Sequence, residues 1–216
     1  VSATGTPQPI TVAPAVIRNG DGNYVVVFGT GRLLTTADKT RPPTGFPQQS
    51  LYGIVDDGGA TEVTRAQLFA QKMTFVSAAA PARRVDPVTG QTGSKRGWRL
   101  DLDSPRADDE GERVISNPIL LQGGAVIFAT AAPSIDACSQ VGTGWTMALN
   151  ALTGGRLDVA TFDLDRNGNV SNDALACGSC AKPIYASGMQ SEVGVSPAPL
   201  ILSTGNTIQL ITGGAS

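Results

Sequence analysis

The stretch Ala15-Val-Ile-Arg-Asn-Gly-Asp-Gly-Asn-Tyr-Val-Val-Val-Phe-Gly29 contains two β-branched runs on either side of a glycine-rich turn. Such runs favour extended strands, and Asn, Gly and Asp between them predict a β-hairpin. The stretch Ser50-Leu-Tyr-Gly-Ile-Val-Asp56 predicts a third strand, which ends at another turn rich in Asp and Gly. We therefore expect the first part of the chain to form a three-stranded antiparallel unit.

A similar plan occurs twice more along the chain. A proline precedes a short apolar strand, and a turn rich in Gly or Asn leads into a second strand; the prolines are Pro14, Pro118 and Pro197. One antiparallel sheet cannot bury both of its faces, and radial stacking of such sheets solves this problem. The sequence therefore predicts an all-β fold, a modified β-propeller or part of one. A β-sandwich is the alternative, because sandwiches use the same hairpins.

The repeated units define the expected organisation of the chain. They lie near residues 9–60, 81–160 and 193–214, and an insertion occupies residues 161–192. Three units are too few to close a propeller ring of the usual size. We therefore expect residues 1–216 to be part of a single β-propeller domain. Because the chain does not begin with Met, we expect it to be a piece of a longer protein.

Two further segments carry local predictions. Residues 62–72 predict one short helix, although its apolar face is weak. Residues 98–102 alternate apolar and polar side chains, which is typical of a half-buried strand. Trp98 and Trp145 are expected to lie in the core of strands rather than to form a platform for a ligand.

Composition excludes several kinds of function. The chain has 216 residues, of which 16% are charged, and a formal net charge of −2. This charge does not attract nucleic acid or an anionic membrane surface. The chain has no histidine, which excludes Ser-His-Asp catalysis and imidazole metal sites. No apolar run is long enough to span a membrane.

The most informative polar segment is Asp163-Leu-Asp-Arg-Asn-Gly-Asn-Val-Ser-Asn-Asp173, with oxygen-bearing side chains at positions 1, 3, 5, 9 and 11. A chain wrapped around Ca²⁺ supplies an oxygen from every second residue, with a backbone carbonyl near position 7 and a glycine turn at position 6. Gly168 and Asn169 occupy positions 6 and 7, but Ala174 replaces the usual Glu at position 12. The segment predicts an EF-hand-like calcium loop. The alternative is a polar hairpin turn, because Asp, Asn and Gly are also common turn residues.

Two other polar clusters have simpler interpretations. The turn at residues 19–23 imitates a second calcium loop, but it is too short, and hairpin turn chemistry explains it. An acidic loop could supply the paired carboxylates of a glycosidase, but it is expected to be a solvated turn. Its members are Asp101, Asp103, Asp108, Asp109 and Glu110.

Several motifs together resemble one known family. They are Gly111-Glu-Arg-Val114, Val126-Ile-Phe-Ala-Thr130, the Pro-Ser-x-x-x-Cys of Pro133 to Cys138, Asn150-Ala-Leu-Thr-Gly-Gly-Arg-Leu157, and the strands at 24–31 and 50–56. In this order they resemble the C-terminal domain of PilY-type proteins, the tip-associated factors of type IV pili. The resemblance covers nearly the whole chain.

The resemblance implies a modified β-propeller on an exported protein of the cell surface or pilus tip, also found in the periplasm or outer membrane. It implies minor pilins as partners, a role in pilus assembly, opposition to retraction, twitching motility, and adhesion to a host or abiotic surface. It also implies calcium ligands at alternate positions of the loop. These are Asp163, Asp165, Asn167, Asn169 through its backbone, and Ser171, with Asp173 or a water as the substitute for direct ligation by Ser171.

Three cysteines are present: Cys138, Cys177 and Cys180. A redox C-x-x-C needs a thioredoxin-like strand and helix, and a zinc site needs four nitrogen or sulfur ligands. In an exported protein, a structural disulfide is the usual state of such cysteines. Three pairings are open, and every one of them leaves one cysteine without a partner in the chain.

Two classes of function follow. The first is a non-enzymatic, calcium-binding module of the pilus tip. The second is a quinone-dependent dehydrogenase propeller, which also combines strand repeats with bound calcium. The second class needs charged and aromatic residues around a cofactor, whereas only 5% of this chain is aromatic. The sequence therefore favours recognition without catalysis.

Overall fold

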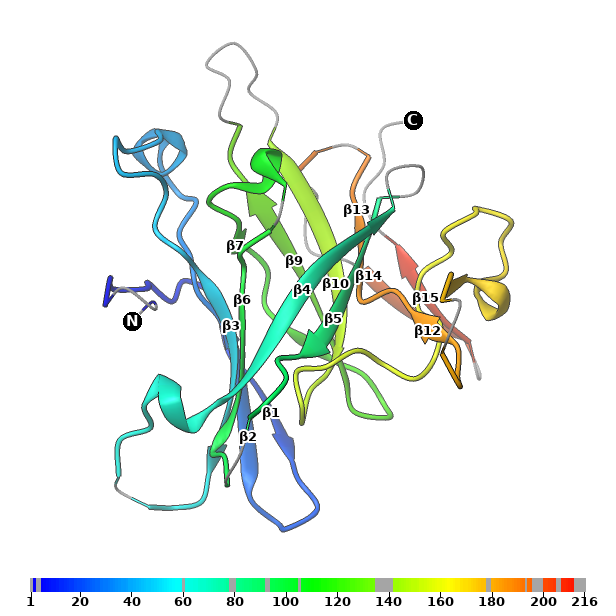
Figure 1. Ribbon diagram of the computed structural model, residues 1–216, viewed down its shortest axis with the longest axis horizontal. Helices are drawn as coiled ribbons and strands as arrows, with labels where there is room; N and C mark the ends of the chain where they lie inside the picture. Colours follow the sequence, from blue (N-terminus) through cyan, green and yellow to red (C-terminus); the bar gives the residue numbers. More distant parts are fainter. Residues whose placement is uncertain are drawn as a thin grey trace.

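The computed structural model describes residues 2, 5–59, 61–77, 81–91, 94–104, 106–134, 142–177, 180–192, 194–195, 200–204 and 207–211. Over these residues the chain is almost entirely β-strand and loop (Figure 1). The strands are β1 (Ala15–Arg18), β2 (Tyr24–Gly29), β3 (Ser50–Asp56), β4 (Phe69–Ser77), β5 (Ala82–Pro87), β6 (Gly97–Asp101), β7 (Arg113–Val114), β8 (Ile119–Leu120), β9 (Ala125–Ala132), β10 (Thr143–Asn150), β11 (Ala174–Leu175), β12 (Ile184–Tyr185), β13 (Gly188–Gln190), β14 (Leu200–Thr204) and β15 (Thr207–Ile211). Short 3₁₀ turns are η1 (Thr36–Lys39), η2 (Arg65–Gln67), η3 (Ala107–Asp109) and η4 (Val170–Asn172).

Eleven strands form one sheet. Its order is β1-β2-β3-β6-β4-β5-β13-β10-β9-β7, and β8 also pairs with β9. Neighbouring strands are antiparallel except for β4 and β6, which are parallel. Two hairpins, β11–β12 and β14–β15, form separate two-stranded sheets. The all-β class is therefore confirmed.

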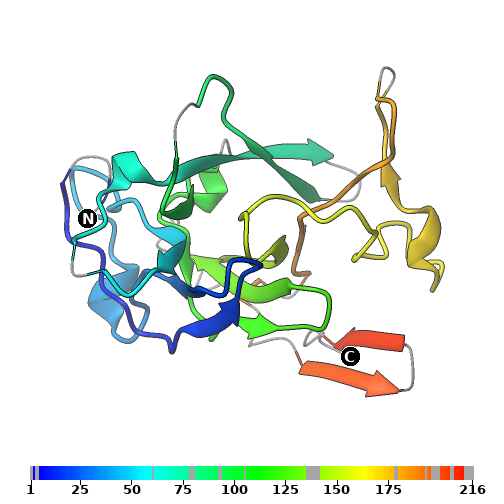
Figure 2. The ribbon, with the colours of Figure 1, turned by 90° about the horizontal axis from the view of Figure 1, so that it is seen from below.

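The large sheet curls on itself into a half-barrel, which the view from below shows best (Figure 2). Its two ends approach each other, because the N–H of Val114 on β7 donates to the carbonyl of Thr30 just beyond β2, at 3.1 Å. Glycine allows this approach, since a Cβ at Gly29 would overlap the side chain of Val114. The curled sheet thus encloses one main core.

Apolar side chains from most strands of the sheet fill this core. Its members include Val25, Val27, Leu51, Val85, Leu100, Phe128, Met147 and Leu149. Trp98 and Trp145 are fully buried in it, as predicted for strand residues. Both indole N–H groups have acceptors: Trp98 donates to the carbonyl of Ala151 at 2.9 Å, and Trp145 donates to Asp109 at 3.0 Å. Pairing each buried indole with an acceptor avoids the cost of an unsatisfied donor.

The predicted hairpins are present. Strands β1 and β2 pair in register from Ala15 opposite Val27 to Arg18 opposite Tyr24. The side-chain oxygen of Asn19 accepts the N–H groups of Asp21 and Asn23, so the turn uses it to hold its own backbone. The interpretation of residues 19–23 as a turn is confirmed. In the second unit, β8, β9 and β10 also form the expected antiparallel arrangement.

The relation between the units differs from the expectation of separate stacked sheets. Strand β6, which lies within the second unit, pairs with β3 of the first unit and with β4, and β4 continues through β5 and β13 to β10. A strand at the edge of a sheet exposes unpaired backbone groups, and the pairing of β6 with β3 satisfies those at the edge of the first unit. The first two units therefore share one curled sheet.

The predicted helix at residues 62–72 is wrong. The turn η2 occupies only residues 65–67, and β4 follows it. Thr64 and Gln67 form a capping box that starts a helical turn. From residue 71 the burial then alternates, with Gln71 and Met73 buried and Lys72 and Thr74 exposed. A strand in the sheet produces this alternation. Burial of its inward side chains outweighs the tendency of the capping box to start a helix.

The acidic loop is not wholly solvated, which corrects the sequence interpretation. Asp108 is exposed, but Asp109 is 1% exposed and pairs with Arg83 at 2.8 Å. Arg83 also pairs with the buried Glu112 at 2.6 Å, and its guanidinium lies 3.6 Å from the centre of the Trp145 ring. A buried carboxylate needs a counter-charge, and the loop folds inward so that Asp109 meets Arg83 of β5.

The substitution Gly154→Ala is expected to destabilise the core. Gly154 has φ +69, and a Cβ there would overlap the Trp98 ring. Gly58→Ala is the matched control, because Gly58 has φ +74 with open space around it. Backbone strain alone should cost about 1–2 kcal/mol at Gly58, and overpacking should add about 1–3 kcal/mol at Gly154. Urea unfolding of both variants measures the difference; equal losses would show that the Trp98 contact is unimportant.

No helix in the described ranges has both the length and the apolar character needed to cross a membrane.

Candidate metal centre

The predicted calcium loop lies in the connection between β10 and β11. Figures 1 and 2 show this connection in yellow, beside the curled sheet and outside its core. It ends in η4, whose first turn is capped by the side chain of Asn169. The loop itself thus lies outside the large sheet, whereas β13 (Gly188–Gln190), within the insertion expected at residues 161–192, is a strand of that sheet.

A second, smaller core anchors both ends of the loop. Phe162, immediately before the loop, is 3% exposed and belongs to a cluster with Ala82, Ile127, Ala148 and Ala186. Leu164 and Leu175 pack against the same cluster. These anchors were not predicted from the sequence. Their signal is the pair of apolar residues that flank Asp163 and the leucine two residues after Asp173.

The loop backbone wraps around the side chain of Asp163. One carboxylate oxygen of Asp163 accepts the N–H of Asn167 at 3.2 Å, and the other accepts the N–H of Gly168 at 2.8 Å. Arg166 and Gly168 have φ +60 and +81, which is the left-handed conformation that reverses the chain. The guanidinium of Arg166 pairs with Glu192, beyond β13. These contacts fix the first half of the loop.

Three carboxylates meet in the loop. Asp163, Asp165 and Asp173 each offer an oxygen, and these oxygens all lie within 4.8 Å of one another. Asp173 is 7% exposed, and its Oδ1 accepts the N–H of Asp165 at 3.3 Å. Its Oδ2 is buried and has no hydrogen-bond partner among the residues that the structure describes. Leaving a buried carboxylate oxygen unpaired is costly, and a hard cation would satisfy it.

The other predicted ligands make contacts within the loop. Asn167 donates to Asp165 at 2.7 Å, which holds its amide beside the carboxylates. The side-chain oxygen of Asn169 accepts the N–H and hydroxyl of Ser171, so only the backbone of Asn169 remains for an ion. Hydrogen bonds of this kind also occur in a plain polar turn. The unpaired oxygen of Asp173 is the feature that a plain turn leaves unexplained, and calcium binding stays a prediction.

A disulfide joins Cys177 to Cys180, with Cα atoms 5.5 Å apart. Of the three pairings left open by the sequence, the structure contains the one with the shortest loop. It lies between β11 and β12, immediately beyond the carboxylate cluster. Cys138 lies outside the described residues. The predicted disulfide in the insertion is therefore present.

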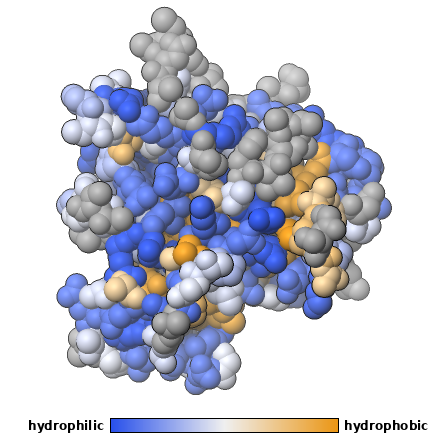
Figure 3. Space-filling model, viewed as in Figure 1, coloured by the Kyte–Doolittle hydropathy of each residue, from blue (hydrophilic) through white to orange (hydrophobic). Residues whose placement is uncertain are grey.

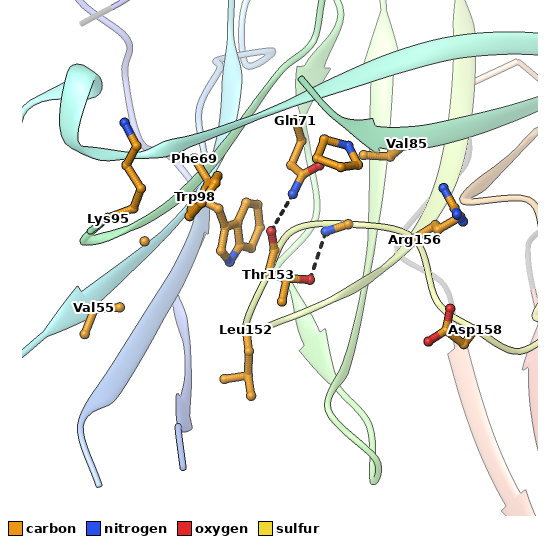
Figure 4. A pocket seen from close by; sticks show the side chains of 13 residues that line it. Val55, Phe69, Gln71, Val85, Lys95, Trp98, Leu152, Thr153, Arg156 and Asp158 are labelled. Carbon is orange, nitrogen blue, oxygen red and sulfur yellow. Dashed lines mark hydrogen bonds between the residues drawn. The ribbon is translucent and has the colours of Figure 1, made fainter. Parts of the chain in front are cut away.

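A separate cavity of about 540 Å³ lies between the sheet and the loop after β10 (Figure 4). Trp98, Phe69 and Leu152 contribute apolar walls, and Gln71 of β4 donates to the carbonyl of Thr153 at 2.7 Å, which pins the loop. Its cations already have protein partners: Lys95 donates to the carbonyl of Ala66, and Arg156 pairs with Asp86. The wider surface in Figure 3 is mostly hydrophilic, with apolar residues in small patches. Neither feature defines a second charged site.

Comparisons with known proteins agree with this structure. A family model described as the PilY1 beta-propeller domain matches residues 1–74. The chain is 35% identical over 214 residues to a type IV pilus biogenesis factor PilY1 homolog of Xylella fastidiosa, covering 95% of this chain and 16% of that protein. It is 34% identical over 192 residues to the type IV pilus biogenesis factor PilY1 of Pseudomonas aeruginosa, covering 80% of this chain and 16% of that protein. The chain thus spans about a sixth of the length of these relatives.

The fold has a solved counterpart. The crystal structure of the Pseudomonas aeruginosa PilY1 C-terminal domain superposes with a TM-score of 0.78 at 27% identity, over all of this chain and 45% of that one. The curled all-β sheet thus matches part of a β-propeller-type domain. By sequence and by fold, the chain is a PilY-type C-terminal domain. The relatives are named as pilus biogenesis factors, which favours the pilus interpretation over a quinone-dependent dehydrogenase.

Proposed function

We propose that this chain is a non-enzymatic, calcium-binding module of a protein that supports type IV pilus assembly and controls pilus retraction. The observation that carries the calcium part is the buried, unpaired Oδ2 of Asp173 within 4.8 Å of two further carboxylates. The pilus part is supported by relatives named as type IV pilus biogenesis factors.

Calcium would be held by the carboxylates of Asp163, Asp165 and Asp173. The side chain of Asn167 and the backbone of Asn169 would add oxygens, and Ser171 would contribute directly or through a water. The bound ion would neutralise three like charges that otherwise repel one another. With these ligands we expect an affinity of the extracellular type, roughly micromolar to millimolar.

Calcium would act on the pilus by ordering a surface loop that partners recognise. The proposed partners are minor pilins at the pilus tip, and a host or abiotic surface for adhesion and twitching. The protein would be exported, at the cell surface or pilus tip, with pools in the periplasm or outer membrane. Calcium changes assembly only if the partner binds the loaded and empty loops with different affinity. The loaded loop is proposed to oppose retraction, and its loss to permit it.

The piliation experiment tests this function. Asp163→Ala in the full-length protein should lower the number of surface pili severalfold when the retraction motor is present. Deleting the motor should restore most of them. Asp158→Ala removes an exposed carboxylate outside the loop and should leave piliation unchanged. Normal piliation and twitching in an Asp163→Ala strain whose protein binds no calcium would refute control of retraction and leave only a structural ion.

A further inference from the structure

We propose that the Cys177–Cys180 disulfide positions Asp173 in the calcium site, so that calcium affinity depends on the oxidation state of the disulfide. The proposal rests on the calcium site proposed above and adds a form of regulation to it. Its basis is the way in which the chain holds the three carboxylates.

The loop itself holds two of the three carboxylates. Asp163 accepts two backbone N–H groups, one of them at 2.8 Å, and follows the buried Phe162. Asp165 accepts the N–H of Asn167 at 3.1 Å and its side-chain amide at 2.7 Å. Both carboxylates therefore keep their places through contacts with residues no more than five positions away.

Asp173 is held differently. Its hydrogen bonds within the loop are long, because its N–H donates to the carbonyl of Val170 at 3.3 Å and its Oδ1 accepts from Asp165 at 3.3 Å. It stands directly before β11, and among the described strands β11 pairs with β12 alone. The position of Asp173 therefore depends on the β11–β12 hairpin.

This hairpin is short and needs support. It has two residue pairs, Ala174 opposite Tyr185 and Leu175 opposite Ile184. Isolated two-stranded ribbons are marginally stable in water. Leu175 packs against the second core, and the disulfide closes a short ring inside the connection between the strands, starting two residues beyond Leu175. The disulfide restricts the conformations of this connection and so favours the hairpin that holds Asp173.

Reduction breaks the sulfur–sulfur bond and forms two thiols. A dithiol such as dithiothreitol supplies the two electrons and two protons and becomes a cyclic disulfide. If the hairpin then loosens, calcium must reorder it, and the calcium affinity falls. Linkage requires the reverse effect by the same factor, because bound calcium makes the disulfide harder to reduce. We expect a factor of about 10, which corresponds to a reduction potential lower by about 30 mV.

The test compares the protein with and without the bond. Calcium titration by calorimetry should give a dissociation constant about 10-fold higher for Cys177→Ser/Cys180→Ser than for the oxidised wild type. Cys138→Ser, which removes the cysteine outside this bond, should leave it unchanged. Thermal unfolding without calcium shows whether each variant is folded. If the double variant is unfolded, the Cys138→Ser protein reduced with dithiothreitol replaces it.

The reciprocal measurement separates positioning from a general effect on stability. The Cys138→Ser protein is equilibrated with reduced and oxidised dithiothreitol, with and without saturating calcium, and the free thiols are counted. Calcium should shift the midpoint by the factor found in the titrations. Equal calcium affinities in the oxidised and reduced states, or a midpoint that calcium does not move, would overturn the proposal. Absence of calcium binding by the oxidised wild type would instead refute the calcium site itself.

Discussion

Replacing Asp163 by alanine is expected to abolish calcium binding, with a loss of affinity of roughly 100-fold or more. The substitution removes one of the three clustered carboxylates. It also removes the two carboxylate oxygens that accept hydrogen bonds from the N–H groups of Asn167 and Gly168. Calorimetric titration with calcium measures the effect, since the wild type should release or absorb heat that the variant does not.

Two further variants show which property of Asp163 matters. Asp163→Asn keeps a side-chain acceptor for the loop but removes the charge, so it should also bind calcium poorly. Asp158→Ala removes an exposed charge outside the loop and should titrate like the wild type. Equal calcium heats in the wild type and Asp163→Ala would exclude this loop as the binding site.

Replacing Arg83 by methionine is expected to lower the free energy of unfolding by about 3–5 kcal/mol. Arg83 lies between Asp109 and Glu112, and all three side chains are at most 1% exposed. Burial raises the pKa of Asp109, but Arg83 and the hydrogen bonds from Trp145, Thr143 and Ser104 outweigh it and leave the pKa below its usual value. Without Arg83, two buried carboxylates would lose their counter-charge. Urea unfolding at neutral pH measures the loss.

Arg84→Met is the matched control for this prediction. Arg84 is the next residue along β5 and pairs with Asp86, but its side chain is 32% exposed. A partly exposed pair contributes little, so this variant should lose no more than about 1 kcal/mol. Adding Asp109→Asn and Glu112→Gln to Arg83→Met should recover part of the stability, because the unpaired charges are then absent. Similar losses for Arg83→Met and Arg84→Met would show that the buried pairs do not stabilise the fold.

Local sequence patterns predicted the hairpins well. The β-branched runs on either side of Asn19 to Asn23 specify strands and a turn with little help from the rest of the chain. The same holds for β9 and β10, which are long apolar strands consecutive in the sequence with one connection between them. These elements depend on contacts between neighbours in the sequence, and such contacts are what a single sequence reveals.

Long-range pairing was not predictable in the same way. The parallel pairing of β4 with β6 replaced the helix expected at residues 62–72, because a sheet position outweighed a weak helical face. Arg83, Asp109 and Glu112 come from β5, the turn η3 and the loop before β7, and no spacing links them. Asp109 was therefore assigned to a solvated turn, although its carboxylate is buried.

In the candidate site, too, the local pattern was predictable and the long-range contacts were not. Alternating oxygens predicted the loop, with Asp173 or a water as the substitute for direct ligation by Ser171. The burial of Asp173 could not be predicted, because it depends on the pairing of β11 with β12 and on packing of Leu175 against residues up to about ninety positions away. The choice of Cys177 and Cys180 among three pairings likewise depends on the fold.

Native mass spectrometry of the purified wild-type chain measures directly whether the loop binds calcium. The protein is stripped of metal, exchanged into buffers with increasing calcium, and weighed intact, with magnesium as the control cation. We expect one calcium ion per chain at micromolar to millimolar calcium, and none in Asp163→Ala. A wild-type chain that stays metal-free at millimolar calcium, or that takes up the same calcium after Asp163→Ala, would contradict this expectation.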